Sequence, residues 1–149
     1  MSKGEPNLMS LQTMQKEIEY LVSQYARSID EADTDLAATL WSTTDEATFI
    51  HPRSHERGWE QVKKRLYEET MRDRFTHRKL QIHDLDVQCY ENMAIAVFYW
   101  TFDAIFRSDG RLHRTQGRET QVFRYTDDRW LLVHVHYSGM PITGEREGF

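Results

Sequence analysis

The 149-residue chain has one cysteine, three prolines and no long apolar run. Because Cys89 has no partner for an internal disulfide, the chain fits a reducing compartment, where Cys89 is a small buried hydrophobic residue. No window approaches the roughly 18 uninterrupted apolar residues that a membrane-spanning helix needs, and the start of the chain has no apolar signal core. These absences predict a cytoplasmic protein with no membrane partner.

Basic surface and the common catalytic motifs are also lacking. The net charge is −5 and the Lys and Arg residues are scattered, so the electrostatic term of nucleic-acid binding is missing and we expect no nucleic-acid partner. Neither a glycine-rich phosphate loop, nor a serine elbow with triad partners, nor paired-cysteine zinc spacing is present. We therefore expect either simple binding or chemistry that uses no cofactor.

What the chain does have is the composition and patterning of a globular protein. A hydrophobic content of 39% with 12% aromatic residues is too rich for disorder. Apolar residues at helical spacing predict a first helix over 11–31, a short second helix over 36–41 after Asp33 as N-cap, and a third from Gly58 to about Arg74. Residues 48–51 are predicted as a short strand, and 53–57 as a loop.

Strands dominate the second half of the chain. β-forming residues bounded by turns predict strands at 76–90, 93–107, 112–125 and 129–138. Helices first and an antiparallel meander afterwards predict an α+β fold, with three N-terminal helices packed on a curved antiparallel sheet. Because 93–107 is apolar on both faces, we expect its outer face to pack on a second subunit in a homodimer or larger homo-oligomer. The predicted organisation is a flexible N-terminus (1–10), a single domain (11–141) and a C-terminal tail (142–149).

The closing run carries a family resemblance. Its pattern is Arg118-x-Thr120-x-Val122, then Trp130-x-x-Val133-His134-x-His136-x-Ser138-Gly139. Over 11–141 the chain resembles the SnoaL-like members of the nuclear transport factor 2-like superfamily. In this run it is closest to the association domain of calcium/calmodulin-dependent protein kinase and its free-standing bacterial relatives. The resemblance implies a cone with a pocket between helices and concave sheet, and dimers or rings built through the sheets. Gln121, Tyr137 and Thr101 stand where the kinase domains carry pocket arginines.

A second relative in that superfamily, ketosteroid isomerase, suggests an altered catalytic site. It uses a tyrosine on the first helix, a carboxylate base before a proline, and a protonated acid on a strand. Tyr25 falls at the tyrosine position, His51-Pro52 replaces the acid–proline pair, and Gln121 takes the approximate place of the protonated acid. The resemblance implies His51 as base, with Tyr25 and Gln121 stabilising enolate charge. The alternative interpretation is that His51 is only a turn residue and Tyr25 only a core residue.

The register of the last hairpin decides which of its side chains face the pocket. A plain two-residue turn at 127–128 places Glu119 opposite His136, whereas a one-residue bulge places it opposite Tyr137. The residues alone leave both open, and the resemblance favours the bulge, with Glu119, Gln121 and Tyr137 lining the cavity. His134-x-His136 has the spacing of a metal ligand pair, but no third ligand is identifiable, so no metal site is predicted.

Other candidates complete the predicted pocket. Asp103 interrupts an apolar strand, and an inward carboxylate near Glu119 would have a raised pKa; at an open strand end it would instead be hydrated. Further ligand-binding residues are expected at Trp41, Trp59, Val62, Leu66, Tyr99 and Thr101. As plain core, the apolar ones would look the same.

The sequence thus supports two functional hypotheses. The first is a cytoplasmic homodimer that binds a small apolar or aromatic molecule and isomerises or hydrates it by proton transfer. The second is a non-catalytic assembly module, in which Arg118, Thr120, His134 and His136 organise subunit contacts.

Overall fold

The computed structural model describes residues 10–140. The elements are α1 (Leu11–Glu31), α2 (Thr34–Leu40), β1 (Thr48–His51), β2 (Ser54–Arg57), α3 (Trp59–Val62), the π-helical η2 (Lys63–Arg72), β3 (Phe75–Cys89), β4 (Met93–Phe106), β5 (Leu112–Thr126) and β6 (Arg129–Gly139). The predicted α+β class, with helices on a curved sheet, is confirmed. The predicted terminal segments lie outside the described residues, apart from Ser10.

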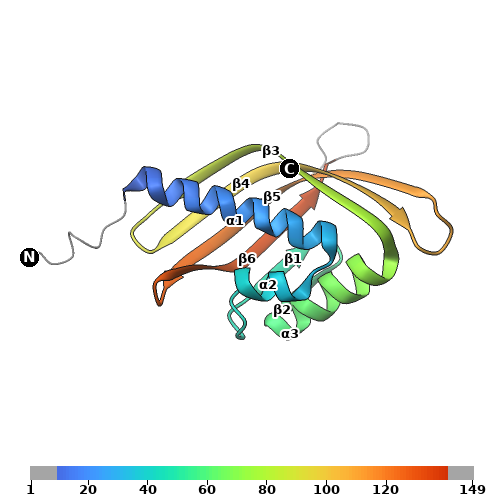
Figure 1. Ribbon diagram of the computed structural model, residues 1–149, viewed down its shortest axis with the longest axis horizontal. Coiled ribbons are helices and arrows are strands. Elements are labelled where there is room, and N and C mark those ends of the chain that lie inside the picture. Colours follow the sequence, from blue (N-terminus) through green and yellow to red (C-terminus); the bar gives the residue numbers. More distant parts are fainter. Residues whose placement is uncertain (1–9, 141–149) are drawn as a thin grey trace, which may run out of the picture.

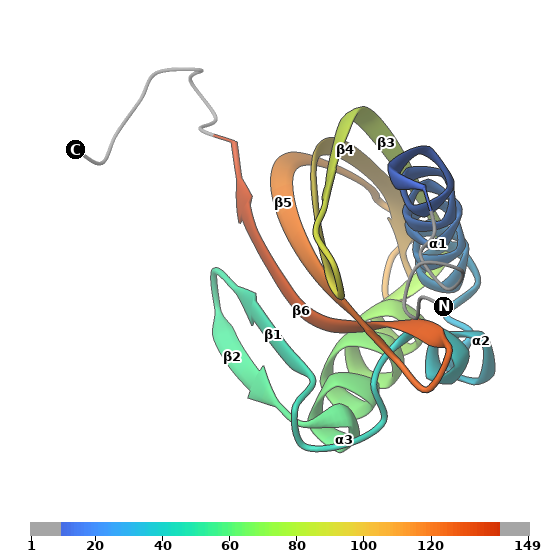
Figure 2. The ribbon, with the colours of Figure 1, turned by 90° about the vertical axis from the view of Figure 1, so that its left-hand side faces the viewer.

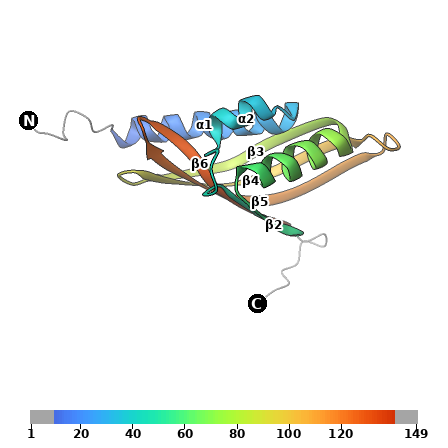
Figure 3. The same cartoon turned by 90° about the horizontal axis from the view of Figure 1, so that it is seen from below.

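The strands form one sheet in the order β2-β1-β6-β5-β4-β3. Neighbouring strands are antiparallel except β1 and β6, which run parallel. The sheet curls around the helices, as Figure 2 shows, and α1, α2 and α3 all lie on its concave side (Figures 1 and 3). None of the helices within residues 10–140 is long and apolar enough to cross a membrane.

The prediction of a loop over 53–57 is wrong for most of that segment. Its residues Ser54–Arg57 form β2, which pairs with β1 so that His51 lies opposite Ser54 and Phe49 opposite Glu56. The prediction was wrong because the strand is made of polar residues and shows no apolar alternation. Its buried position is instead a carboxylate, since Glu56 is buried whereas His55 is half-buried and Arg57 is exposed.

Capping explains where the first two helices begin and end. The Ser10 hydroxyl accepts a hydrogen bond from the backbone N–H of Thr13 (3.0 Å), which satisfies a donor that has no partner within the helix. Helix α1 ends at Ala32, whose positive φ of 50° reverses the chain. The Asp33 side chain then caps α2 by accepting from the backbone N–H of Leu36 (3.0 Å).

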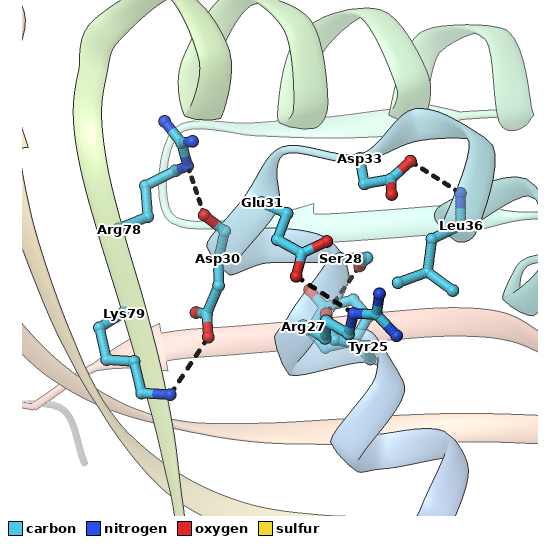
Figure 4. A network of polar contacts seen from close by, with 9 residues as sticks. All are labelled: Tyr25, Arg27, Ser28, Asp30, Glu31, Asp33, Leu36, Arg78 and Lys79. Atoms are coloured by element: carbon cyan, nitrogen blue, oxygen red, sulfur yellow. Dashed lines mark hydrogen bonds and ion pairs between the residues drawn. The ribbon is translucent and has the colours of Figure 1, made fainter.

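Asp30 fastens the end of α1 to β3, as Figure 4 shows. Its carboxylate accepts a hydrogen bond from the backbone N–H of Leu80 (2.7 Å) and pairs with Lys79 (3.4 Å). Its backbone carbonyl accepts from Nε of Arg78 (3.1 Å). These contacts fix the axis of α1 relative to the sheet, and with it the depth of the cone.

The third helix runs as predicted, but most of it is wider than an α-helix. Helix α3 continues without a break into η2, and the Thr70 hydroxyl donates to the carbonyl of Arg65 five positions earlier (2.7 Å). π-Helical turns are rare and are often found near functional sites. On the inner side, Tyr67 is fully buried, and its hydroxyl bonds Ser28 (2.8 Å) and accepts from Nε1 of Trp41 (3.2 Å).

Candidate functional site

A cavity of about 730 Å³ lies between α1, η2, the β1–β2 turn and the concave face of β3 to β6. This volume is that of a typical small-molecule site. About half of the lining residues are apolar or aromatic, among them Ile29, Phe49, Leu66, Phe75, Trp100 and Phe102. The other half are polar or charged, including His51, Glu56 and Glu119, so the site is able to orient a ligand by hydrogen bonds and charge.

A histidine–carboxylate pair stands in this cavity. Nε2 of His51 lies 2.8 Å from Oε2 of Glu56. The residues are diagonal neighbours on one face of the β1–β2 hairpin. Glu56 is only 4% exposed, and the His51 ring stacks against Phe49 and Tyr137, with centroid distances of 4.9 and 6.2 Å. The imidazole is therefore held in one orientation, with a carboxylate available to stabilise its charged form.

A second carboxyl group in the cavity is neutral. Glu119 is 5% exposed, and burial raises its pKa to about 8. The hydrogen bond from Gln121 lowers the pKa, but by less than burial raises it. That bond runs from Nε2 of Gln121 to Oε2 of Glu119 (2.7 Å). At neutral pH the carboxyl group holds its proton, so it is able to donate a hydrogen bond to a ligand.

Tyr25 and Tyr137 add two neutral hydroxyl groups. Burial, followed by the charge of Glu119, raises the pKa of both tyrosines. Tyr137 lies opposite Glu119 on the paired strands, and Gln121 lies opposite Val135. This register confirms the bulged hairpin, whose irregularity falls between Val122 and Phe123.

Five of the residues predicted for the site line the cavity together: Tyr25, His51, Leu66, Glu119 and Tyr137. Their roles stay predictions. Gln121 is fully buried behind them and acts on the cavity through Glu119. Trp41, Trp59 and Val62 were expected as cavity walls, but they are core residues beneath the helices and do not line it.

The predicted positions of Tyr99, Thr101 and Asp103 are wrong. The side chains of a strand alternate between its two faces. Because Trp100 and Phe102 line the cavity, the three odd-numbered residues lie on the outer face of β4. Thr101 bonds there to His83 across the strand pair (3.0 Å), and Tyr99 is 43% exposed.

Asp103 does not form an acid/base pair with Glu119. It makes a bidentate ion pair with Arg114, which lies opposite it on β5. The hydrogen bond from Arg114 lowers the pKa of Asp103, whereas the sequence predicted a raised value. An exposed carboxylate with its own cation is a surface feature rather than a catalytic acid.

Among the cavity residues that sequence reasoning missed, Glu56 and Trp100 are the two most important for the site. Glu56 was overlooked because it lay in a polar stretch predicted as a loop. Trp100 was overlooked because Tyr99, Thr101 and Asp103, on the opposite face of the strand, were expected in the cavity. Its ring lies over Gly117, where a Cβ atom would collide with it, and its edge packs on Tyr137 at a centroid distance of 5.3 Å. The signal for Trp100 in the sequence was Gly117, a glycine that lies opposite this tryptophan on the paired strand.

Comparison with known proteins identifies the family. The SnoaL-like domain matches residues 18–143. The chain belongs to the SnoaL-like family, within the nuclear transport factor 2-like superfamily. A superfamily protein from Salmonella enterica serovar Typhimurium LT2 is 40% identical, with a TM-score of 0.89, over 94% of this chain and 100% of that one. No curated protein sequence matches the SnoaL-like chain significantly.

Two more distant structures share the fold alone. The hexachlorocyclohexane dehydrochlorinase LinA-type3 from Novosphingobium barchaimii is 12% identical with a TM-score of 0.75, covering 86% of this chain and 87% of its own. The association domain of C. elegans CaMKII is 19% identical with a TM-score of 0.68, covering 85% and 96%. The predicted resemblance to the superfamily is confirmed by the family match and by the 40% identical relative.

Proposed function

We propose that this SnoaL-like protein binds a small apolar or aromatic molecule and catalyses a proton transfer on it without a cofactor, as an isomerase or as a lyase that hydrates or eliminates. The observation that carries the proposal is the His51–Glu56 pair in a partly apolar cavity that also holds a neutral carboxyl group. A base and a proton donor that share one cavity are the minimum that such chemistry requires.

His51 is the proposed base. When Nε2–H donates to Glu56, Nδ1 keeps its lone pair and accepts a proton from a carbon atom of the substrate. The imidazolium that forms is stabilised by the Glu56 carboxylate, which is acceptor-only when ionised. Negative charge on the substrate is stabilised by hydrogen bonds from the neutral Tyr25, Tyr137 and Glu119 groups. Gln121, expected in that role, instead positions Glu119.

The relatives support the reaction class without specifying it. One structure with this fold is a hexachlorocyclohexane dehydrochlorinase, so the fold accommodates an elimination in at least one protein. At 12% identity this says nothing about the present substrate. The proposal therefore depends on the residues in the cavity.

Ring opening of 5-nitrobenzisoxazole tests the proposed base. A base removes the C3 proton, the N–O bond breaks, and the coloured cyanophenolate forms with no co-reactant. We expect the purified protein to accelerate this reaction and His51→Ala to lower kcat/KM by roughly 100-fold, the lower end of general-base contributions. The exposed His77 lies outside the cavity, so His77→Ala should keep the full rate. Equal rates for His51→Ala and the unmodified protein would refute the role.

We further propose a homodimer that forms through the outer face of the sheet. Val97 and Tyr99 on that face are 41% and 43% exposed, and apolar side chains side by side on a sheet surface are typical of subunit contacts. A pure assembly module is the second candidate function, and this face is the observation that favours it. The cytoplasmic location stays a prediction.

A further inference from the structure

Three arginines line the rim of the cavity, although the whole chain carries a net charge of −5. Arg53 lies in the β1–β2 turn, Arg65 on η2, and Arg74 directly before β3. Arg65 shares its charge with Glu69 at 3.9 Å. Within residues 10–140, Arg53 and Arg74 have no carboxylate partner within ion-pair distance.

The charges of Arg53 and Arg74 act on the same point inside the cavity. Both favour the ionised form of the Tyr137 hydroxyl, although burial and Glu119 outweigh them and raise its pKa. Arg74 also contributes, after burial, to the lowered pKa of His113, another cavity residue. Two guanidinium groups from separate elements thus create a positive potential at one end of the cavity.

The acidic side chains of the cavity do not cancel this potential. Glu69 is paired with Arg65 and Lys64, Glu119 is neutral below about pH 8, and Glu56, which is hydrogen-bonded to His51, leaves one negative charge against the two guanidinium charges. Arg74 is also held in place, since its guanidinium carbon lies 5.5 Å from the centre of the Phe75 ring. A cation over an aromatic face is restricted in the orientations that it adopts.

A buried donor in the wall also lacks a partner. Nε1 of Trp100 has no hydrogen-bond partner among the described residues 10–140, and the side chain is 7% exposed. Buried N–H groups are nearly always satisfied in folded proteins. A ligand with an acceptor atom in its body would satisfy this one.

We propose that the substrate is an organic acid, whose flat apolar body fills the cavity and whose carboxylate or similar oxyanion lies between Arg53 and Arg74. This inference rests on the proposed function, since it names the substrate class of the same cavity. Arginine suits the task because its planar donor fork matches an oxyanion. Trp100 then donates to an acceptor in the body of the substrate.

A pair of fluorescent probes tests the charge preference without any turnover. 8-Anilinonaphthalene-1-sulfonate and N-phenyl-1-naphthylamine share one aromatic skeleton, and only the first carries an anionic group. We expect the Arg53→Gln/Arg74→Gln double variant to weaken sulfonate binding about tenfold, as for lost hydrogen bonds to a charged group, and to leave the neutral probe unchanged. The Arg53→Lys/Arg74→Lys variant, which keeps both charges, should recover part of the affinity.

Matched controls locate the effect. Lys16→Gln/Arg27→Gln removes two charges from exposed side chains of α1 outside the cavity and should leave sulfonate binding unchanged. Met71→Trp narrows the cavity and should weaken both probes. The inference is overturned if both double variants lose the same affinity, or if Met71→Trp binds both probes normally. If the arginine variant binds the sulfonate normally while 5-nitrobenzisoxazole turnover still depends on His51, the substrate class is wrong and the proposed function stands.

Discussion

Nε2 of His51 and Oε2 of Glu56 lie 2.8 Å apart inside the cone, although the first residue ends β1 and the second lies on β2. The tight turn between the strands brings the two side chains onto one face. A carboxylate as buried as Glu56 is costly unless it is paired. Each member of the pair therefore depends on the other for its stability. The functional interpretation rests on the hairpin that brings them together.

Glu119 should make the folded protein less stable as the pH rises. Its pKa is raised from 4.5 to about 8 by burial, so between these values the folded state holds a proton that the unfolded chain has lost. The stability contribution is complete below about pH 4.5 and is lost as the pH rises through about 8. The free energy of unfolding should decrease by up to about 1.4 kcal/mol per pH unit in this window.

Urea unfolding at a series of pH values measures this slope. Glu119→Gln keeps the shape of the side chain and stays neutral, so the slope should become flatter and the variant should exceed the unmodified protein in stability at pH 8. Glu60 is exposed, and Glu60→Gln should keep the original slope. The same slope in all three proteins would show that Glu119 is ionised in the folded state.

Gly117 should be intolerant of any side chain. A Cβ atom there would collide with the Trp100 ring and lie 2.6 Å from the carbonyl oxygen of Ser138. We expect Gly117→Ala to destabilise the protein by about 1–3 kcal/mol through overpacking and to displace Trp100. Gly139 is a matched control, because the nearest atom to its Cβ would be 3.8 Å away. Urea unfolding followed by tryptophan fluorescence measures both, and equal stability of the two variants would contradict the packing.

The outer face of the sheet should hold two copies of the chain together. Light scattering is expected to give about twice the chain mass of 17.8 kDa. Val97→Glu places a charge beside Tyr99 and opposite Asp86 and Thr120, and it should give a monomer, because a charge buried next to a like charge is costly. Tyr20, which is 62% exposed on α1, is the control, and Tyr20→Glu should leave the mass unchanged. A discrete ring would instead favour the assembly module.

Much of the fold followed from pattern alone, because strong periodicity is a local property. The stripe of α1 predicted that helix and its buried face, and β4 was predicted as a strand, although not which of its two faces lines the cavity. The bulged register, which places Glu119 opposite Tyr137, needed the family resemblance. A one-residue irregularity leaves no distinct mark in composition, so the residues alone fit both registers.

The site was less predictable, because it depends on long-range placement. Glu56 has no apolar periodicity around it, and its role arises only when β2 folds back on β1. A polar residue in an apolar strand indicates either an inner site or a surface ion pair, and the inner site was predicted for Asp103. The structure shows the surface ion pair, because Arg114 lies opposite Asp103 on the next strand. His51 was identified from its position before Pro52, but the partner that orients it was not.

The most direct test of a functional His51–Glu56 pair is a double-mutant cycle on the ring opening of 5-nitrobenzisoxazole. Glu56→Gln keeps the size of the side chain but removes its charge, and it should lower kcat/KM by roughly 10-fold or more, the value of a hydrogen bond to a charged group. If the two residues act as one base, Glu56→Gln should have almost no effect once His51 is alanine. Equal losses from Glu56→Gln with and without His51 would contradict the account.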